Sequence, residues 1–488
     1  MAGQAYSGPL ENIGGYRWRI PKSYKSGMNV DGIIYADEKL IEQIRHDNAP
    51  EQVANVACLP GIVRASLAMP DIHWGYGFPI GGVAATDPAA GGVVSPGGVG
   101  YDINCGVRIL RSDLTAAEVR PRIEELVAQI FAHVPCGVGV GGPVRFTEKE
   151  LRRLVVEGAR YIVRRGHGSS EDLERTEAGG ALEGADPDAV SPRAYERGRD
   201  QVGTLGAGNH FLEVQVVDEV YDLATAEAFG VREGGVTFMI HCGSRGLGHQ
   251  VCDDYLKTMR GAARRYGFDL PDPQLCCAPV HSDEGQAYLG AMRAAANYAW
   301  ANRQLLMVLV REAVSKVFGQ PPERLGLHLV YDVAHNIAKL EPHDRGDGRT
   351  QTVCIHRKGA TRAFPAGHPE VPEVYRGVGQ PVLIPGDMGR YSFLLVGLPQ
   401  AMAETFGSVC HGAGRAMSRH EAQRRVRGEQ VRQDLAARGI LAMTRSWRGL
   451  AEEYSGAYKD VADVVGVVAR AGLARNVCRL RPLGVIKG

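Results

Sequence analysis

Apolar residues recur at helical spacing in several stretches of the chain. In 116–134 they are Val119, Ile123, Leu126, Val127 and Ile130, and this spacing predicts an amphipathic helix. The same pattern predicts helices over 148–164, 415–438 and 458–471. Residues 286–317 are rich in alanine, so we expect a mostly buried helix there, or a pair of helices.

Short apolar, β-branched runs border glycine-rich loops elsewhere in the chain. Val236–Ile240, Leu327–Tyr331 and Val382–Ile384 are such runs, and they predict strands. Strands and helices do not alternate regularly, which favours an α+β fold over a doubly wound sheet. We therefore expect one catalytic domain over 1–488. Within it, 166–199 is polar and lacks periodicity, which predicts an exposed, mobile insertion.

Charge, apolar segments and cysteines limit which classes of protein the chain can belong to. The formal net charge is +1, so a nucleic-acid partner would have to meet local basic clusters and not a global positive field. The first 14 residues lack an apolar segment and no apolar run is long enough to span a bilayer, so we expect neither a signal peptide nor membrane insertion. The ten cysteines lack Cys-x-x-Cys spacing, which favours reduced thiols in the cytoplasm.

The loop His411-Gly412-Ala413-Gly414-Arg415 carries the most specific chemistry. It is expected to open directly into the helix predicted over 415–438. Glycines and a helix N-terminus suit a phosphate, arginine can bind its oxygens, and histidine can attack phosphorus or shuttle a proton. The loop therefore indicates phosphoryl or nucleotidyl transfer, although glycine-rich turns before helices also occur as structural turns with no chemical role.

Several metal-type side chains follow apolar runs or lie in glycine-rich loops. They are Asp102, Cys105, Asn209, His210, His241, Asp332, His335 and Asn336. A thiolate, carboxylates and imidazoles together suit a borderline divalent ion, held at a mononuclear or dinuclear site. Taken singly, each residue is better explained as a turn cap or a hydrogen-bonded side chain, and their dispersal gives no spacing signature.

Two further segments combine cations with glycine and hydroxyl groups, 356–362 and 244–246. Such combinations are common at phosphate contacts, so Arg245, Lys358, Arg362 and Arg415 are candidates for RNA or phosphate binding. The alternative for these segments is a solvated loop. The arginines of 415–438 are either an RNA-facing stripe or a solvated helix face.

Taken together, the motifs resemble the RtcB family of RNA-splicing ligases. The resemblance runs from about Pro70 to Gly488, in the same order as in that family. The resembling segments are 70–82, 102–106, 203–213, 241–246, 332–336, 356–362 and 411–415. It implies a single RtcB-like domain of mixed sheets flanked by helices, with the active site in a cleft of glycine-rich loops.

The resemblance also assigns roles to individual residues. His411 matches the catalytic nucleophile, which takes GMP from GTP. The family's two Mn²⁺ ions would be bound by Asp102, Cys105, His210, His241 and His335, with Cys105 bridging. Positions for the guanine nucleotide are Asn209, His210, Phe211, Leu212, Glu213, His335, Asn336, Pro385, Gly386, Asp387, Met388, Ser392, His411, Gly412, Ala413, Gly414, Tyr458 and Lys487.

The implied reaction joins an RNA 3′-phosphate or 2′,3′-cyclic phosphate end to a 5′-hydroxyl end, in tRNA splicing or RNA repair. Its intermediates are histidine–GMP and an RNA end activated as 3′-ppG. An archease-type activator is the implied protein partner. The chain departs from the family at Asp387, where serine is usual, at Cys242, a milder change, and in 166–199.

Two alternative functions use the same residues. A metal-dependent phosphodiesterase or phosphatase would need the metal ligands but no guanylylation, and His411 on its loop distinguishes the two readings. A non-catalytic RNA-binding subunit would need neither the nucleophile nor the metal.

Overall fold

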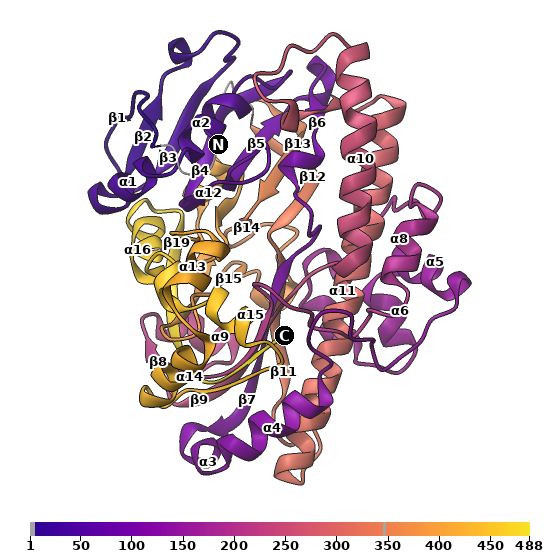
Figure 1. The fold of residues 1–488 in the computed structure, drawn as a ribbon, viewed down its shortest axis with the longest axis vertical. Coiled ribbons are helices and arrows are strands. Elements are labelled where there is room, and N and C mark those ends of the chain that lie inside the picture. Colours follow the sequence, from indigo (N-terminus) through magenta and orange to yellow (C-terminus); the bar gives the residue numbers. More distant parts are fainter. Residues whose placement is uncertain (1–4, 345–347) are drawn as a thin grey trace.

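Two large β-sheets form the framework of the chain (Figure 1). The computed structural model describes residues 5–344 and 348–488. The first sheet has the order β1 (Glu11–Asn12), β2 (Arg17–Ile20), β3 (Asp31–Tyr35), β4 (Ile62–His73), β5 (Ile80–Thr86), β13 (Thr350–Lys358) and β12 (Asn336–Asp344). The expected α+β class is confirmed, because helices and strands do not alternate regularly along the chain.

The second sheet supplies most of the candidate site. Its order is β11 (His328–Ala334), β7 (Gly106–Thr115), β9 (Gly235–Cys242), β8 (Phe211–Val220), β19 (Ala474–Lys487), β16 (Ser392–Gly397) and β15 (Pro381–Ile384), with β18 (Leu441–Thr444) also paired to β19. The runs predicted as strands lie in β9, β11 and β15. β9 is buried along its whole length, as its apolar, β-branched sequence requires.

Two further sheets have two strands each. They pair β10 (Ala278–Pro279) with β6 (Val93–Val94), and β14 (Ala360–Arg362) with β17 (Ser408–Cys410). The second pair lies directly before the histidine loop, so it fixes where that loop leaves the framework.

A single long helix, α11 (Asp283–Phe318), accounts for the alanine-rich stretch. The Ser282 side chain caps its N-terminus by accepting from the Gly285 N–H, and Gly319 ends it in a left-handed conformation. Small side chains let α4 (Ile123–His133), α5 (Glu148–Glu157), α6 (Ala159–Arg164) and α10 (Arg245–Arg265) pack against it. In Figure 1, α10 and α11 stand along one side of the sheets.

Two predicted helices are interrupted. The 116–134 stretch divides into α3 (Ala116–Val119), a 3₁₀ turn over Arg120–Arg122 and α4, where Pro121 prevents continuous helical hydrogen bonding. The 148–164 stretch divides at Gly158, which has φ 59° and ψ −138°. A side chain there would meet the Gly180 carbonyl oxygen, because a Cβ would lie 2.1 Å from it.

The segment 166–199, expected to be an exposed, mobile insertion, is only partly exposed. The segment contains α7 (Ser170–Glu174) and α8 (Pro192–Gly198), and it buries both apolar and polar side chains. Asp172 accepts two hydrogen bonds from Arg311 on α11, at 2.8 and 2.9 Å. Part of the polar composition therefore reflects buried ion pairs, while other residues of the segment are exposed.

The remaining helices surround the first sheet and the C-terminal strands. They are α1 (Glu38–Arg45), α2 (Ala49–Val56), α9 (Leu223–Phe229), α12 (Pro399–Thr405), α13 (Arg419–Arg425), α14 (Gly428–Ala437), α15 (Trp447–Glu452) and α16 (Val461–Arg470). Among the described residues, no helix combines the length and the apolar character that crossing a bilayer requires.

Candidate active site

Two groups of metal-type ligands share one thiol. Cys105, His241 and His335 form one group, and Asp102, Cys105 and His210 form the other, with the ligand atoms of each group within 4.8 Å of one another. The Cys105 Sγ lies 3.2 Å from His241 Nε2 and 3.6 Å from His210 Nε2. The structure thus brings together the five residues that the family resemblance assigned to metal binding.

Neighbouring strand ends converge to build these groups. Cys105 immediately precedes β7, His241 lies near the end of β9, and His210 immediately precedes β8. In the sheet, His241 is opposite Val107 on one side and Phe211 on the other. His335 occupies the single-residue gap between β11 and β12, and therefore connects the two sheets.

Hydrogen bonds orient His210 for ligation. Its Nδ1 lies 2.9 Å from the Leu205 carbonyl oxygen, to which it must donate. Nε2 then faces the Asp102 carboxylate at 2.8 Å. Burial alone would raise the pKa of Asp102, but the hydrogen bond and charge of His210 hold it below its usual range. A second contact fixes Asp102, because the Ser244 N–H donates to it at 2.9 Å.

The protonation chemistry of the site fits a bound cation. Burial raises the pKa of the Cys105 thiol to about 12, so a thiolate there needs a positive partner. Burial also lowers the pKa of His241 and His335 well below the usual value, which keeps both imidazoles neutral and able to ligate. Sulfur, nitrogen and carboxylate donors together suit a borderline divalent ion.

His411 lies beside this cluster. The centroid of its ring is 5.0 Å from that of His335, at an interplanar angle of 76°. The His411 Nδ1 is 2.5 Å from Asp71 Oδ2, and the same oxygen accepts from the backbone N–H of His411 at 2.9 Å. Asp71 therefore holds Nδ1–H, and the Nε2 lone pair is free for nucleophilic attack.

Asp71 is a functional residue to which the sequence analysis assigned no role. Burial alone would raise its pKa, but the charge and hydrogen bonds of His411 hold the pKa below its usual range. A carboxylate two residues before His73 in an otherwise apolar run was the only signal available in the sequence. That signal does not identify the partner, which is 340 residues away along the chain.

The histidine loop does not open directly into a helix, contrary to expectation. The next helix, α13, begins at Arg419 and is capped by Ser418. Gly414 serves a different purpose, since it has φ 72° and a Cβ would lie 2.2 Å from the Asp71 carbonyl oxygen. Glycine at this position therefore lets the loop approach the backbone of β4 closely. The predicted 415–438 helix is divided into α13 and α14.

Comparison with known proteins identifies the family. A family model described as tRNA-splicing ligase RtcB matches residues 52–488. This chain belongs to the RtcB family. The tRNA-splicing ligase RtcB of Archaeoglobus fulgidus is 57% identical over 481 residues, which cover 99% of each chain.

Two further relatives come from other organisms. The tRNA-splicing ligase RtcB of Thermococcus kodakarensis is 56% identical over 480 residues, covering 98% of this chain and 99% of the relative. The RNA-splicing ligase RtcB of Mycobacterium tuberculosis is 54% identical over 439 residues, covering 90% of this chain and all of the relative. Identity at this level over nearly the full length identifies this RtcB family member as an RNA ligase.

One subset of the candidate nucleotide positions lies around two buried carboxyl groups, Glu213 and Asp387. Burial raises the pKa of Glu213 to about 8, the charge of Asp387 adds to the increase, and Gln215 and Lys487 oppose it. The Ser392 hydroxyl accepts from the Gly386 N–H at 3.2 Å and from Gln215 at 3.3 Å. Pro385 and Met388 are buried beside this turn, and Leu212 is fully buried in the core.

A second subset lies around Glu453, which was not predicted. Its carboxylate contacts the Tyr458 hydroxyl and accepts from Arg415 Nη1 at 3.3 Å. The Arg415 guanidinium also lies 5.0 Å from the centroid of the Tyr458 ring. The Lys487 ammonium donates to the Gly208 carbonyl oxygen at 2.7 Å. The Arg415 guanidinium is therefore engaged in contacts within the protein.

Asparagine and aromatic candidates border the metal-type groups. The Asn336 Nδ2 donates to the Asp102 carbonyl oxygen at 3.1 Å, and its Oδ1 accepts from the Gly359 N–H at 2.9 Å. The Phe211 ring packs edge-on against His241, with ring centroids 5.2 Å apart. Asn209 is exposed on the preceding loop, while Gly412 and Ala413 are buried behind His411.

The four candidate RNA contacts differ in their surroundings. Arg245 is partly exposed and lies 3.4 Å from His210 Nδ1. The Lys358 ammonium is buried and donates to the carbonyl oxygens of Tyr76 and Phe78, at 2.5 and 3.1 Å. Arg362 is 1% exposed. The structure thus places Lys358 and Arg362 inside the protein, because segment 356–362 runs through β13 and β14 and is not a solvated loop.

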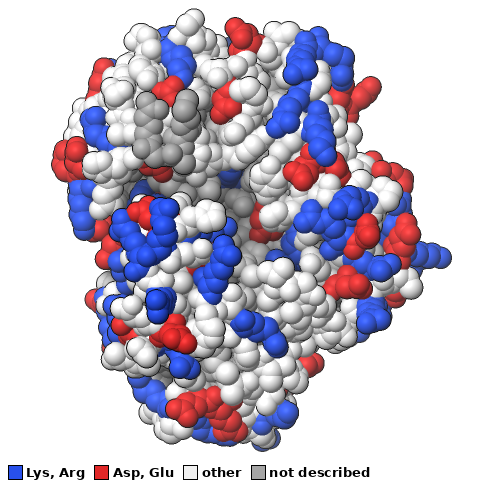
Figure 2. Space-filling view, in the orientation of Figure 1, with Lys and Arg blue, Asp and Glu red and all other residues white. Residues whose placement is uncertain are grey.

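Basic side chains gather around a hollow on one face of the molecule (Figure 2). Figure 2 shows Lys and Arg side chains on both sides of a hollow near the middle of this face. The exposed arginines of α13 and α14 include Arg419, Arg424, Arg425 and Arg432. Positive charge at a cleft attracts a polyanion even when the net charge is small.

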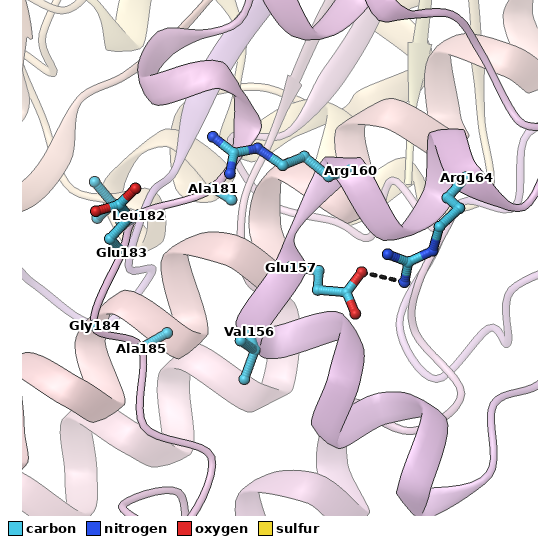
Figure 3. A pocket seen from close by; sticks show the side chains of 9 residues that line it. All are labelled: Val156, Glu157, Arg160, Arg164, Ala181, Leu182, Glu183, Gly184 and Ala185. Atoms are coloured by element: carbon cyan, nitrogen blue, oxygen red, sulfur yellow. Dashed lines mark ion pairs between the residues drawn. The ribbon is translucent and has the colours of Figure 1, made fainter.

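A separate groove, of about 410 Å³, lies between α5, α6 and residues 181–185, and shares no residue with the site (Figure 3).

Asp332, a candidate ligand by position, belongs to neither metal-type group. It binds two buried arginines instead, accepting from Arg108 at 2.7 Å and from Arg303 at 2.8 Å. Arg303 also donates to the carbonyl oxygens of Asn104 and Cys242, at 2.7 and 2.9 Å. These carbonyls adjoin Cys105 and His241. Arg303, held by Asp332, therefore connects the two segments that carry these ligands.

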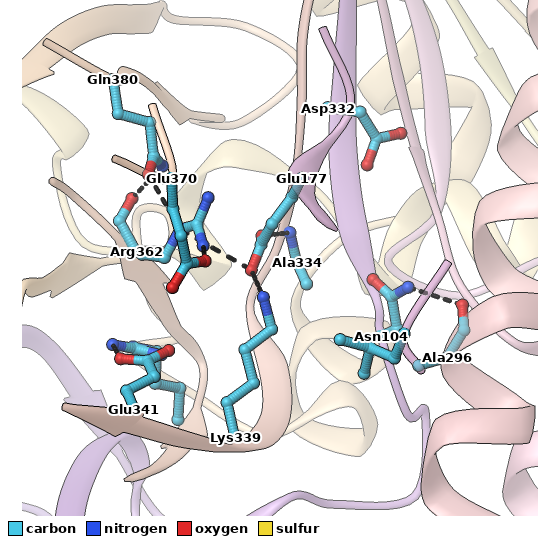
Figure 4. Close-up of polar contacts among 12 residues, drawn as sticks. Asn104, Glu177, Ala296, Asp332, Ala334, Lys339, Glu341, Arg362, Glu370 and Gln380 are labelled. Atoms are coloured by element: carbon cyan, nitrogen blue, oxygen red, sulfur yellow. Dashed lines mark hydrogen bonds and ion pairs between the residues drawn. The ribbon is translucent and has the colours of Figure 1, made fainter. Parts of the chain in front are cut away.

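Glu177 holds the third ligand-bearing segment. Its carboxylate accepts from the Ala334 N–H at 2.8 Å and from the Lys339 ammonium at 2.5 Å (Figure 4). Arg362 Nε lies 3.9 Å from the same carboxylate. Ala334 directly precedes His335, so a residue of the 166–199 segment fixes the position of a metal-type ligand.

Replacing Glu177 with Ala is expected to weaken metal binding as well as the fold. The change leaves the buried Lys339 ammonium unpaired, at a cost of about 3 kcal/mol, and frees the backbone before His335, which we expect to lower metal affinity about 10- to 100-fold. Thermal unfolding and calorimetric titration with Mn²⁺ measure the two effects. Glu370→Ala is the matched control, because Glu370 pairs with the same Arg362 through an exposed carboxylate. Metal affinity equal to that of the native chain would contradict the assignment.

Proposed function

We propose that this chain is a GTP- and Mn²⁺-dependent RNA ligase that joins 3′-phosphate or 2′,3′-cyclic phosphate ends to 5′-hydroxyl ends. The observation that carries the proposal is the position of His411, whose ring contacts His335 while Asp71 holds its Nδ1. A nucleophilic imidazole next to two groups of cation ligands suits nucleotidyl transfer. In this proposal the two large sheets belong to a single catalytic domain.

The first step is guanylylation of His411. Its Nε2 attacks the α-phosphorus of GTP, a P–N bond forms, and the bond to pyrophosphate breaks. The imidazole becomes positively charged in the transition state, and the Asp71 carboxylate stabilises that charge through Nδ1–H. Two Mn²⁺ ions, bound by Asp102, Cys105, His210, His241 and His335, would neutralise phosphate charge during the transfer.

The next steps move GMP to RNA and then release it. An oxygen of the RNA 3′-phosphate attacks the phosphoramidate, the P–N bond breaks, and RNA-3′-ppG forms. The 5′-hydroxyl then attacks the 3′-phosphorus, and GMP leaves as the phosphodiester forms. A cyclic phosphate end is first opened by water to the 3′-phosphate. We assign contacts with the RNA phosphates to Arg245 and the exposed arginines of α13.

Guanine recognition falls to the two subsets of candidate nucleotide positions described above. Glu213 and Asp387 offer carboxylate oxygens to guanine N–H groups, with Ser392, Tyr458 and Lys487 around them. An archease-type activator, a cytoplasmic location and the choice between tRNA halves and damaged RNA stay predictions.

Labelling with GTP tests the proposal. Incubation with Mn²⁺ and GTP labelled at the α-phosphate should leave acid-labile label on the protein, whereas label at the γ-phosphate should not remain. Sealing should occur with 3′-phosphate ends and not with 3′-hydroxyl ends. Release of inorganic phosphate or opening of cyclic phosphate without any protein label would instead support the phosphodiesterase or phosphatase alternative.

The affinity for GTP is expected to rise with pH. Burial gives Glu213 a pKa of about 8, so its carboxyl group is mostly protonated at pH 6.5 and mostly ionised at pH 8.5. If the ionised form accepts from guanine, affinity increases about 20-fold over this range. Calorimetric titration with GTP at several pH values measures the change, and Glu213→Gln should abolish it. Affinity that falls with rising pH would contradict the assignment of Glu213.

A further inference from the structure

Lys459 is a buried lysine that contacts the backbone on both sides of Asp71. It lies between Tyr458 and α16 and is 5% exposed. Its ammonium donates to the Pro70 carbonyl oxygen at 3.2 Å and to the Ile72 carbonyl oxygen at 2.5 Å. One side chain therefore holds the residues immediately before and after the carboxylate that binds His411.

The backbone around Lys459 contacts the histidine loop as well. The Lys459 N–H donates to the Gly414 carbonyl oxygen at 3.0 Å, and the Ala416 N–H donates to the Ala457 carbonyl oxygen at 2.8 Å. The Arg390 guanidinium donates to the Lys459 carbonyl oxygen at 3.1 Å. Lys459 thus joins the two segments that carry Asp71 and His411.

The strand that carries Asp71 needs such support. β4 pairs with β5 at Ala68 and again at His73, and the register shifts between these two points. Asp71 lies within this irregular stretch, where the regular ladder of β4 and β5 does not fix its position. The side chain of Lys459 supplies hydrogen bonds to the carbonyl oxygens on either side of Asp71 in this stretch.

We propose that Lys459 is a positioning residue for guanylylation of His411. It fixes the position of the Asp71 segment relative to the histidine loop. Asp71 then stays hydrogen-bonded to His411 Nδ1, and Nε2 faces the α-phosphorus. The proposal rests on the proposed function, because it assigns a role in the first step of that reaction. A displacement of about 1 Å at a reacting group can cost on the order of 100-fold in rate.

The charge of Lys459 supports the same role. Burial lowers its pKa to about 8, while Asp71 and Asp47 oppose that shift. The ammonium in turn helps to hold the pKa of Asp71 below its usual range. An ionised Asp71 is the form that accepts a hydrogen bond from both the ring and the backbone of His411.

Separating the half-reactions tests the proposal. Lys459→Met removes the ammonium and keeps a side chain of similar length. In this variant we expect the rate of guanylylation by α-labelled GTP to fall about 30-fold or more, while the KM for GTP stays within about threefold. Sealing of RNA whose 3′-phosphate already carries GMP bypasses His411, and should stay within about threefold of the native rate.

Two further variants separate positioning from stability. Lys459→Gln keeps an amide donor and should recover part of the guanylylation rate. Tyr375→Phe removes another buried donor, the hydroxyl that binds the Val330 carbonyl oxygen at 2.9 Å, and should leave both half-reactions unchanged.

Three results overturn the inference: guanylylation within threefold of native in Lys459→Met, an equal fall in both half-reactions, or failure of both Lys459 variants to fold. Failure of the native chain to acquire label or to seal activated RNA would instead refute the proposed function itself.

Discussion

Replacing His411 with Ala is expected to abolish protein labelling from α-labelled GTP and to lower the ligation of 3′-phosphate ends at least about 10⁴-fold. The reason is local. Asp71 holds Nδ1, the lone pair on Nε2 is free, and the ring lies 5.0 Å from that of His335. His210 also contacts a carboxylate and metal-type ligands, but it belongs to one of the ligand groups itself, whereas His411 belongs to neither group found in the described chain.

The same variant should still seal RNA that already carries GMP on its 3′-phosphate, because that step needs the metal site and the guanine pocket but no nucleophilic histidine. Gel assays of labelled protein and of sealed RNA measure the two activities separately. His281→Ala is a suitable control, since His281 is exposed and should label like the native chain. Label retained by His411→Ala would place the nucleophile elsewhere.

The metal-type ligands could be predicted because the family resemblance assigns them and each lies at the end of an apolar run or in a glycine-rich loop. Cys105 and His241 adjoin β7 and β9, which are neighbours in the sheet. Strand ends at one edge of a sheet bring side chains together whatever the rest of the fold does. The order of the strands, and so the sharing of Cys105 by both groups, depends on tertiary pairing that periodicity does not reveal.

Residues that support the site were not predictable in the same way. Asp71 meets His411 through a contact between segments 340 residues apart. Glu177 lies in a stretch that is polar in composition, and yet its own side chain is only 1% exposed. Its burial is possible because Lys339 and the Ala334 N–H satisfy the carboxylate, and no local pattern announces such partners. Asp332 followed the correct pattern for a ligand but binds Arg108 and Arg303 instead.

Replacing Cys105 with Ala is expected to remove both metal ions, whereas loss of any other ligand should weaken one site more than the other. The Cys105 Sγ is the one ligand atom common to the two groups found in the described chain. His335 belongs to one group and His210 to the other. We expect affinity at each site to fall at least about 100-fold in Cys105→Ala, and ligation to fall with it.

Metal analysis and Co²⁺ absorption provide direct measurements. The native chain should bind two ions per molecule and show thiolate-to-Co²⁺ charge transfer, and Cys105→Ala should show neither. Cys242→Ala is the matched control, because Cys242 is a buried thiol beside His210 that belongs to neither ligand group, so it should keep both ions.

The affinity of the native chain for metal should also rise with pH, because binding must remove a proton from a thiol whose pKa burial raises to about 12. Two ions bound at native affinity in Cys105→Ala would exclude a bridging thiolate, and a binding curve independent of pH would show that the thiol keeps its proton.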